Sequence, residues 1–293
     1  MVNKKTIVNR FDMTALSETF AMSAMINASP EGPWVKPEYV SYVKNQNPWN
    51  GITYFTDKCL HLAYEVKSDI KVAILLEPRE FMPSIYKNIK IYENSFDLIF
   101  TYDEELLNNG SSKYVFAAAD MPSIPLKDCK IHKKSKLISM LISNKKITSG
   151  HKLRHIIVND LFKRIGFTDK IDLFGAAVGN FIDNKAEACN DYMFQIATEN
   201  SRKNKYFADK ILDCFITGCI PIYWGAPDIA EYFDPRGILS FETPNELVNI
   251  LKNINEEMYY SMLEYAKINF DIALTYQKPD DFFILKTKEL LNA

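Results

Sequence analysis

Residues 194–225 carry the polar side chains whose types and spacing best fit the binding of a phosphorylated ligand. A Glu-Asn-Ser motif at 199–201 follows an apolar run that predicts a strand, and Asp209-Lys210 opens a stretch that predicts a helix. A further apolar run at 220–224 predicts the next strand. In α/β sheets, ligands bind outside the carboxyl ends of the strands, where a helix N-terminus favours phosphate. This stretch therefore predicts a ligand site in its loop and first helical turn.

The stretch resembles the donor-binding signature of the α-1,3/4-fucosyltransferases. That signature is Phe-Glu-Asn-Ser/Thr, a short loop with an aromatic residue, Thr-Glu-Lys, an amphipathic helix and a Pro-rich strand ending in Gly. The matching positions are Glu199-Asn200-Ser201, Tyr206, Asp209-Lys210 and Pro221-Ile222-Tyr223-Trp224-Gly225. The resemblance is strong over about residues 194–240 and weak elsewhere. Asp209 stands where the family has Glu, which keeps the carboxylate but shortens its reach and leaves the donor sugar open.

The resemblance implies an inverting, metal-independent glycosyltransferase that moves L-fucose from GDP-fucose to a glycan hydroxyl. It implies a GT-B fold, with two Rossmann-like α/β domains facing across a cleft and C-terminal helices. No cofactor besides the donor substrate is expected. Two alternatives stay open: a glycosyltransferase for another nucleotide sugar, and a catalytically silent protein that binds sugar nucleotides or glycans. The retention of Asn200, Tyr206, Asp209 and Lys210 together argues against the silent protein.

Two cations are candidates for holding the donor diphosphate. Lys210 combines an ammonium with the start of a predicted helix, and fixed positive charge would also stabilise the leaving group. Arg154 resembles the arginine with which the family grips the diphosphate, a role that suits the paired donors of a guanidinium. Because the alignment is loose here, Lys152 is the alternative. Asn200 and Tyr206 sit at the family spacing and are expected to contact phosphates or sugar.

Two carboxylates are the candidate catalytic groups. Asp209 would accept hydrogen bonds from ribose or sugar hydroxyls, and its charge would favour an oxocarbenium-like transition state. In the family, the base that takes the acceptor proton is a Glu just after a strand of the first domain. Glu77 is the predicted base because it leaves the end of an apolar strand, and Glu80 is its rival. Glu199 is expected to fix the loop through hydrogen bonds.

The composition of the chain limits which classes of protein it can belong to. The chain has 293 residues with 47% apolar residues and a net charge of −2, which predicts two domains with real cores. Lys and Arg are scattered, so nucleic acid is not an expected partner. No apolar run approaches the ~20 residues that span a bilayer, and residues 1–10 lack the apolar segment of a signal peptide. These features predict a cytoplasmic protein without a transmembrane segment.

Apolar runs alternate with helical patterns along the chain, which predicts parallel sheets. Residues 71–78 and 96–103 predict strands of the first domain, and 171–175 predicts the first strand of the second. The polar stretch at 144–150 places the boundary, giving an acceptor-side domain of residues 1–147 and a nucleotide-sugar-binding domain of residues 148–293 with C-terminal helices. Trp34, Trp49, Tyr54 and Phe55 are candidate sugar-stacking side chains, with core packing as the alternative.

Metal chemistry has little support in the sequence. His151 and His155 have the i,i+4 spacing of helix-borne metal ligands, but no carboxylate completes the set, so they are interpreted as a solvated pair. The five cysteines are widely spaced and contain no Cys-x-x-Cys pair, which predicts free thiols. No metal site is therefore predicted.

Overall fold

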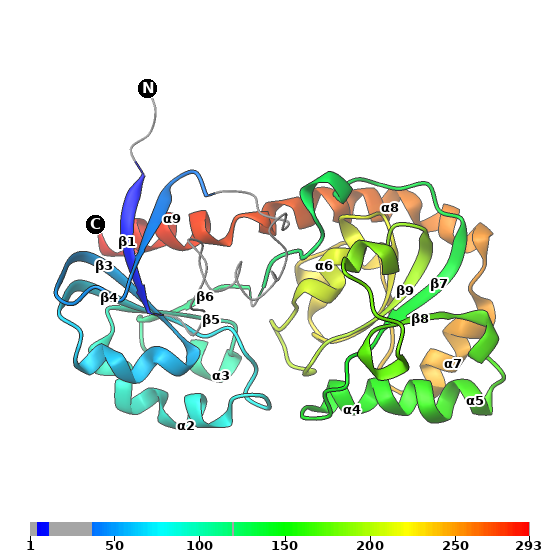
Figure 1. The fold of residues 1–293 in the computed structure, drawn as a ribbon, viewed down its shortest axis with the longest axis horizontal. Helices are drawn as coiled ribbons and strands as arrows, with labels where there is room; N and C mark the ends of the chain where they lie inside the picture. The colour runs from blue at the N-terminus through cyan, green and yellow to red at the C-terminus, as the bar shows by residue number, and fades with distance from the viewer. Residues whose placement is uncertain (1–4, 12–36, 119, 293) are drawn as a thin grey trace. The chain divides into compact units, whose positions relative to one another are not determined.

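A computed structural model describes residues 5–11, 37–118 and 120–292. The chain divides into two compact units, one made of residues 1–121 and 277–293, the other of residues 122–276. Each unit is built around its own parallel sheet (Figure 1). We call these sheet A in unit 1 and sheet B in unit 2.

Sheet A has six parallel strands in the order β2-β1-β3-β4-β5-β6. Their bounds are β1 Thr6–Phe11, β2 Val40–Lys44, β3 Trp49–Thr56, β4 Ser68–Ile74, β5 Leu98–Thr101 and β6 Tyr114–Phe116. Consecutive side chains on a strand point to opposite faces, so a strand buried on both faces reads as an unbroken apolar run. Strand β4 shows this, since Val72 and Ile74 join one core cluster and Ala73 joins another.

Helices cover both faces of sheet A. One cluster packs the sheet against helical segments η1 (Asp57–Tyr64), α2 (Pro83–Tyr92) and α3 (Glu104–Leu107). The other brings in Phe283 and Ile284 of the C-terminal helix α9 (Pro279–Leu291). The carboxylate of Asp281 anchors α9 by accepting the backbone N–H groups of Glu38 and Tyr39, each at 2.9 Å. The last helix of the chain therefore belongs to the first unit.

Sheet B has five parallel strands in the order β11-β10-β9-β7-β8. Their bounds are β7 Lys136–Leu141, β8 Asp172–Phe174, β9 Tyr192–Thr198, β10 Ile220–Trp224 and β11 Leu239–Ser240. The helices of this unit are α4 Ser149–Ile156, the π-helical η4 Ile157–Leu161, α5 Phe162–Arg164, α6 Asp209–Phe215, α7 Pro244–Asn253 and α8 Glu256–Leu274. Short 3₁₀ turns complete the chain at 93–95, 126–128, 168–170, 176–178, 185–188, 229–231, 235–237 and 275–277.

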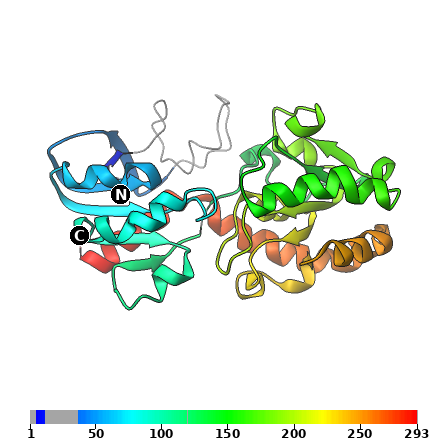
Figure 2. The same ribbon diagram turned by 90° about the horizontal axis from the view of Figure 1, so that it is seen from below.

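The central strands of sheet B are buried throughout. Every residue of β9 and β10 is buried, because helices pack on both sides of them. Figure 1 draws α4 and α5 on one side of the sheet and α6 on the other, and Figure 2 shows α4 and α5 in front of the sheet from below. The carboxyl ends of β9 and β10 thus open into loops that carry polar residues between two helical layers.

The division into units differs from the sequence-based boundary between residues 147 and 148. Strand β7, which that boundary assigns to the first domain, pairs with β8 and β9 of sheet B. Residues 277–293 rejoin unit 1 through the packing of α9. Hydrophobic pattern alone shows that a strand exists, whereas its partners are decided by tertiary pairing. Among the helices that the structure describes, none is long and apolar enough to cross a membrane.

Candidate functional site

The Glu-Asn-Ser motif begins where β9 ends. Glu199 is fully buried, and its backbone N–H donates to the carbonyl of Trp224 at the end of β10 at 2.8 Å. Its carboxylate accepts the backbone N–H of Ala208, the residue before α6, at 3.0 Å. Glu199 therefore ties the end of one strand to the start of the helix that follows, the loop-fixing role expected from the sequence.

Two glycines allow this loop to be closely packed. A Cβ on Gly150 would lie 1.7 Å from the Glu199 carbonyl oxygen, so only glycine lets α4 approach the motif. The N–H of Gly150 donates to the carbonyl of Asn200 at 3.1 Å. A Cβ on Gly225 would meet the Tyr223 hydroxyl oxygen at 2.1 Å and Cγ of Glu199 at 2.7 Å. The loop is thus locked between α4 and the end of β10.

Arg154 reaches this loop from α4. Its Nη2 donates to Oδ1 of Asn200 at 2.7 Å, and its Nε donates to the carbonyl of Thr198 at 3.1 Å. Arg154 is buried, whereas Lys152 is exposed. Of the two cations considered in the sequence, Arg154 is therefore the one brought to Asn200. Tyr206 is buried with an exposed fraction of 2%.

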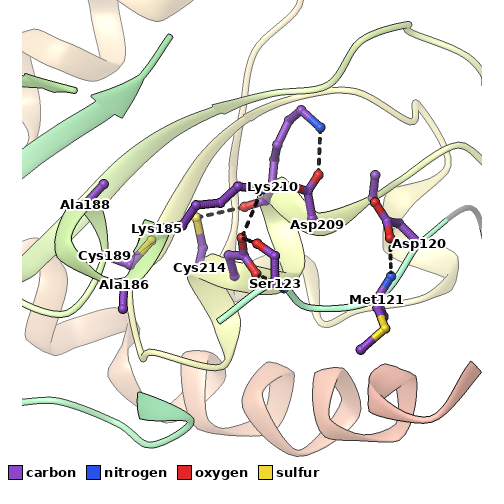
Figure 3. Close-up of polar contacts among 12 residues, drawn as sticks. Asp120, Met121, Ser123, Lys185, Ala186, Ala188, Cys189, Asp209, Lys210 and Cys214 are labelled. Atoms are coloured by element: carbon purple, nitrogen blue, oxygen red, sulfur yellow. Dashed lines mark hydrogen bonds and ion pairs between the residues drawn. The ribbon is translucent and has the colours of Figure 1, made fainter. Parts of the chain in front are cut away.

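Asp209 lies between two lysines, which are shown with it in Figure 3. Lys210 Nζ is 2.8 Å from Oδ1 of Asp209 and 3.3 Å from Oε2 of Glu199. Lys185 forms an ion pair with the other Asp209 oxygen and lies 3.9 Å from Oδ2 of Asp213. Asp213 in turn accepts hydrogen bonds from the backbone N–H and the hydroxyl of Ser123.

Sequence reasoning missed Lys185. It lies in the turn η7 (Lys185–Ala188), which precedes β9 and is distant along the chain from the motif. Its one visible signal is its place in the Asn184–Glu187 capping pattern, which predicts a fixed turn but no ligand. Ion pairing between segments that far apart follows from the fold rather than from spacing.

Mutual attraction keeps Asp209 and Lys210 charged, whereas burial raises the pKa of Glu199 and raises that of Asp213 to about 6. Burial would raise the pKa of the Asp209 carboxyl, but Lys185 and Lys210 outweigh burial and hold this pKa well below its usual value. Burial would lower the pKa of Lys210, yet attraction to Asp209 and Glu199 raises it. Burial lowers the pKa of Arg154, against attraction to Glu199 and Asp209. Asp209 and Lys210 are therefore charged at neutral pH.

Glu77 lies in unit 1, three residues beyond the end of β4 and only partly exposed. Its carbonyl accepts the hydroxyl of Tyr86 at 2.7 Å. A second carboxylate that the sequence analysis did not consider, Asp57, accepts the N–H of Leu76 at 3.0 Å. Burial, helped by the charge of Glu77, raises the pKa of Asp57 to about 7 against the effect of backbone hydrogen bonds and Lys58. Glu80 is exposed on the following turn.

Asp57 could have been noticed by its position directly after β3, at the carboxyl edge where Glu77 also lies. Its backbone has φ of +35°, a left-handed value that is uncommon for a residue other than glycine. Such strain persists only where the surroundings hold a residue in place, and it gathers at functional sites. Asp57 and Glu77 thus form an acidic pair at this edge of sheet A.

His151 is not solvated, so that interpretation was wrong. Its side chain is buried and its Nδ1 lies 2.6 Å from the Thr148 hydroxyl oxygen, where it completes the N-terminal capping box of α4. Burial first, then Arg154, Lys145 and Lys210, lower the pKa of His151 to about 4. Its imidazole is therefore neutral at physiological pH. In the part of the chain that the structure describes, no three His, Cys, Asp or Glu side chains are arranged to hold a metal ion.

The aromatic side chains of the first domain that were candidates for sugar stacking differ in how deeply they are buried. Tyr54 and Phe55 are fully buried in the core of unit 1, so they cannot stack on a sugar. Trp49 is partly exposed, and Trp34 lies outside the described residues. The candidate functional side chains therefore fall into two sets. Unit 2 offers cations with a charged carboxylate, and unit 1 offers partly buried carboxyl groups.

Comparison with known proteins identifies the family of the chain. The family model described as glycosyltransferase family 10 (fucosyltransferase) C-term matches residues 131–283, which hold the whole cluster around Asp209. The chain belongs to this family. Its predicted recognition as fucosyltransferase-like is thereby confirmed.

Curated relatives match over part of their length. The α-(1,3)-fucosyltransferase FucT of Helicobacter pylori is 29% identical over 102 residues, which cover 35% of this chain and 20% of that protein. The 4-galactosyl-N-acetylglucosaminide 3-α-L-fucosyltransferase 9 of Rattus norvegicus is 25% identical over 192 residues, covering 60% of this chain and 48% of that protein. The chain thus spans about a fifth to a half of the length of these family relatives.

Solved structures show the same fold. An α1,3-fucosyltransferase solved with GDP is 16% identical, with a TM-score of 0.57, covering 94% of this chain and 89% of that one. An Anabaena protein solved with UDP-glucose is 13% identical, with a TM-score of 0.58, covering 81% of this chain and 78% of that one. These likenesses, together with the two parallel sheets, confirm the predicted GT-B type α/β fold of this family member.

Proposed function

We propose that the chain is an inverting, metal-independent glycosyltransferase that moves L-fucose from GDP-fucose to a hydroxyl of a glycan. The observation that carries the proposal is the group formed by Arg154, Asn200, Asp209 and Lys210 at the end of β9, inside the segment that matches the family model. Relatives named as fucosyltransferases and a neighbour solved with GDP-fucose support this donor.

In the proposed reaction, the acceptor hydroxyl attacks the anomeric carbon of the donor sugar while the bond from that carbon to the diphosphate oxygen breaks. The bonding electron pair leaves with the diphosphate, whose growing charge Lys210 and Arg154 stabilise. The acceptor proton passes to Glu77, the predicted general base. Asp209 accepts hydrogen bonds from donor hydroxyls and favours positive charge developing at the sugar ring. Asn200 and Tyr206 complete the donor contacts.

A calorimetric titration tests the donor. GDP, UDP and CMP, and their sugars, are each titrated into the protein with and without EDTA. We expect GDP and GDP-fucose to bind and EDTA to change neither affinity. Binding of GDP that disappears with EDTA would contradict metal independence, and preferred binding of UDP or CMP would contradict the donor.

The alternative of another nucleotide sugar rests on Asp209, whose side chain is one methylene shorter than the Glu of the family signature. The fold neighbour solved with UDP-glucose shows that this architecture accepts other donors. A transfer assay with the sugar nucleotide that binds best separates a transferase from a silent binding protein. The anomeric configuration of the product, determined by NMR, tests inversion.

A further inference from the structure

The ammonium of Lys185 is held at the cluster by a rigid turn. Asn184 caps the turn η7: its side chain accepts the N–H of Ala186 at 2.9 Å, and the Glu187 carboxylate accepts the backbone N–H of Asn184 at 3.3 Å. Ala186 and Ala188, both within the turn, are buried. Lys185 therefore projects from an anchored backbone, and only its side chain is left to move.

The charges of the cluster balance only when Lys185 is counted. The carboxyl groups are Glu199, Asp209 and Asp213, and the cations are Lys185, Lys210 and Arg154. Without Lys185, two cations would remain beside three carboxyl groups, of which Asp209 is the one held charged by its lysines. Lys185 therefore adds positive charge to a site that carries several acids.

The side chains of Lys185, Lys210 and Asp209 differ in how much of their surface is exposed to solvent. The side chain of Lys185 is 38% exposed, that of Lys210 is 24% exposed and that of Asp209 is 12% exposed. Lys185 is thus the most accessible of the three charges. A ligand that approaches Asp209 or Lys210 passes its ammonium.

We propose that Lys185 is a third cation that binds the donor diphosphate, and that it exchanges its ion pair with Asp209 for one with a phosphate oxygen. The inference rests on the proposed function, because the diphosphate is that of the nucleotide-sugar donor. Lys210 stays with Asp209 at 2.8 Å and keeps that carboxylate charged. The Asp209 oxygen that Lys185 leaves then becomes available to a donor hydroxyl.

The exchange of ion pairs would couple diphosphate binding by Lys185 to hydrogen bonding of a donor hydroxyl by Asp209. A bound diphosphate draws Lys185 away, and the same movement prepares Asp209 to accept a hydrogen bond from the donor. A ligand without phosphate lacks the charge that attracts Lys185, so it leaves the Lys185–Asp209 ion pair in place. The site would therefore respond to a nucleotide sugar as a whole and discriminate against a free sugar.

The test is a GDP titration of the full chain by calorimetry, comparing wild type with Lys185→Met and Lys185→Arg. The control is Lys163→Met, which removes an exposed lysine of the same unit on α5. Loss of one charge-assisted contact is expected to weaken GDP binding about 10- to 150-fold in Lys185→Met. Lys185→Arg should keep most of the affinity, and Lys163→Met should bind like wild type. Equal affinity in Lys185→Met and wild type overturns the inference.

A double substitution separates direct binding from neutralisation of Asp209. If Lys185 contacts the diphosphate, Lys185→Met still weakens GDP binding when Asp209 is already Asn. If Lys185 merely neutralises Asp209, the effect disappears in the Asp209→Asn background, and the inference is overturned. Melting temperatures of all variants show that they are folded. A wild-type chain that binds no nucleoside diphosphate overturns the proposed function itself, an outcome distinct from failure of the Lys185 variant alone.

Discussion

Asp209 at the carboxyl edge of sheet B and Asp57 at the carboxyl edge of sheet A have pKa values that are shifted in opposite directions. At the edge of sheet B, Asp209 is surrounded by lysines and its pKa is held low. At the edge of sheet A, burial raises the pKa of Asp57 to about 7, and its acidic neighbour Glu77 adds to the shift. The nearby cation Arg79 is paired with Asp103 and Glu105 instead. Asp209 therefore stays charged at neutral pH, whereas Asp57 exchanges its proton near neutral pH.

This difference matches the two tasks of a glycosyl transfer. Binding a diphosphate and stabilising its departure need charges that stay charged, which mutual attraction in the sheet B cluster secures. Accepting a proton from a hydroxyl needs a carboxylate placed to receive it, the role proposed for Glu77 beside Asp57. The comparison can be tested by substitutions that remove one property at a time.

The largest effect is expected from Glu77→Gln. Glutamine keeps the shape and hydrogen bonding of Glu77 but cannot take a proton at neutral pH, so transfer should fall by a factor on the order of 10²–10⁴. GDP affinity should not change, because the donor cluster lies on the other unit. A transfer assay and a GDP titration check both parts.

The matched control for Glu77→Gln is Glu80→Gln, on the exposed turn that follows. It should reduce transfer only slightly. A wild-type rate in Glu77→Gln, or a larger loss in Glu80→Gln, would show that the edge of sheet A does not supply the base at Glu77.

Asp209→Asn should be next in size, with turnover falling by a factor on the order of 10². Donor affinity should fall less, because the substitution also removes the negative charge that holds two lysines. Steady-state kinetics combined with a GDP titration measures the two effects separately. Equal losses in turnover and affinity would mean that Asp209 only binds the ground state of the donor.

Lys210→Ala should weaken GDP binding about 10- to 150-fold, the worth of one charge-assisted contact to a phosphate. Lys152→Ala, on the exposed side of α4, should have little effect. Calorimetric titration of both variants provides the measurement. Unchanged affinity in Lys210→Ala, or a large loss in Lys152→Ala, would contradict the assignment of fixed charge to this edge of sheet B.

The sequence predicted the second unit better than the first. Strand β10 was predicted at its observed bounds, 220–224, and α6 begins at Asp209, where the sequence predicts a helix. These elements are buried and strongly periodic, so pattern alone identifies them. In unit 1, residues 71–78 and 96–103 contain β4 and β5, but β1, β2, β3 and β6 were not recognised.

What the sequence could not supply was contact between distant segments. Lys185 and Asp57 gain their significance from partners elsewhere in the fold, respectively Asp209 and the loop that contains Glu77. His151 was misjudged for the same reason, since a polar residue at helical spacing is usually exposed, whereas here it closes a buried capping box. Motif spacing indicated which loop binds, and only the fold shows how its charges are arranged.

The smallest expected effect is on the pH dependence of stability, and it has opposite signs in the two units. The pKa of Asp57 is raised from 3.8 to about 7 by folding, so the folded chain holds the extra proton between these values. Asp57 therefore stabilises the fold below about pH 4 and loses this contribution as pH rises toward 7. The pKa of His151 is lowered from 6.5 to about 4, so its contribution to stability increases over nearly the same range.

Between pH 4 and 7, Asp57→Asn should therefore make the slope of melting temperature against pH more positive than in wild type. His151→Gln should make this slope less positive. Melting temperatures of wild type and both variants, measured across that pH range, test the two predicted changes of slope. Comparing slopes removes any loss of stability that a substitution causes equally at every pH. The neighbouring charges that bear on these slopes are Glu77 and Lys58 for Asp57, and Arg154, Lys145 and Lys210 for His151. Slopes that change in the same direction in both variants would contradict a raised pKa for Asp57 and a lowered pKa for His151, because burial favours the neutral form of each group and these forms differ by a proton in opposite directions.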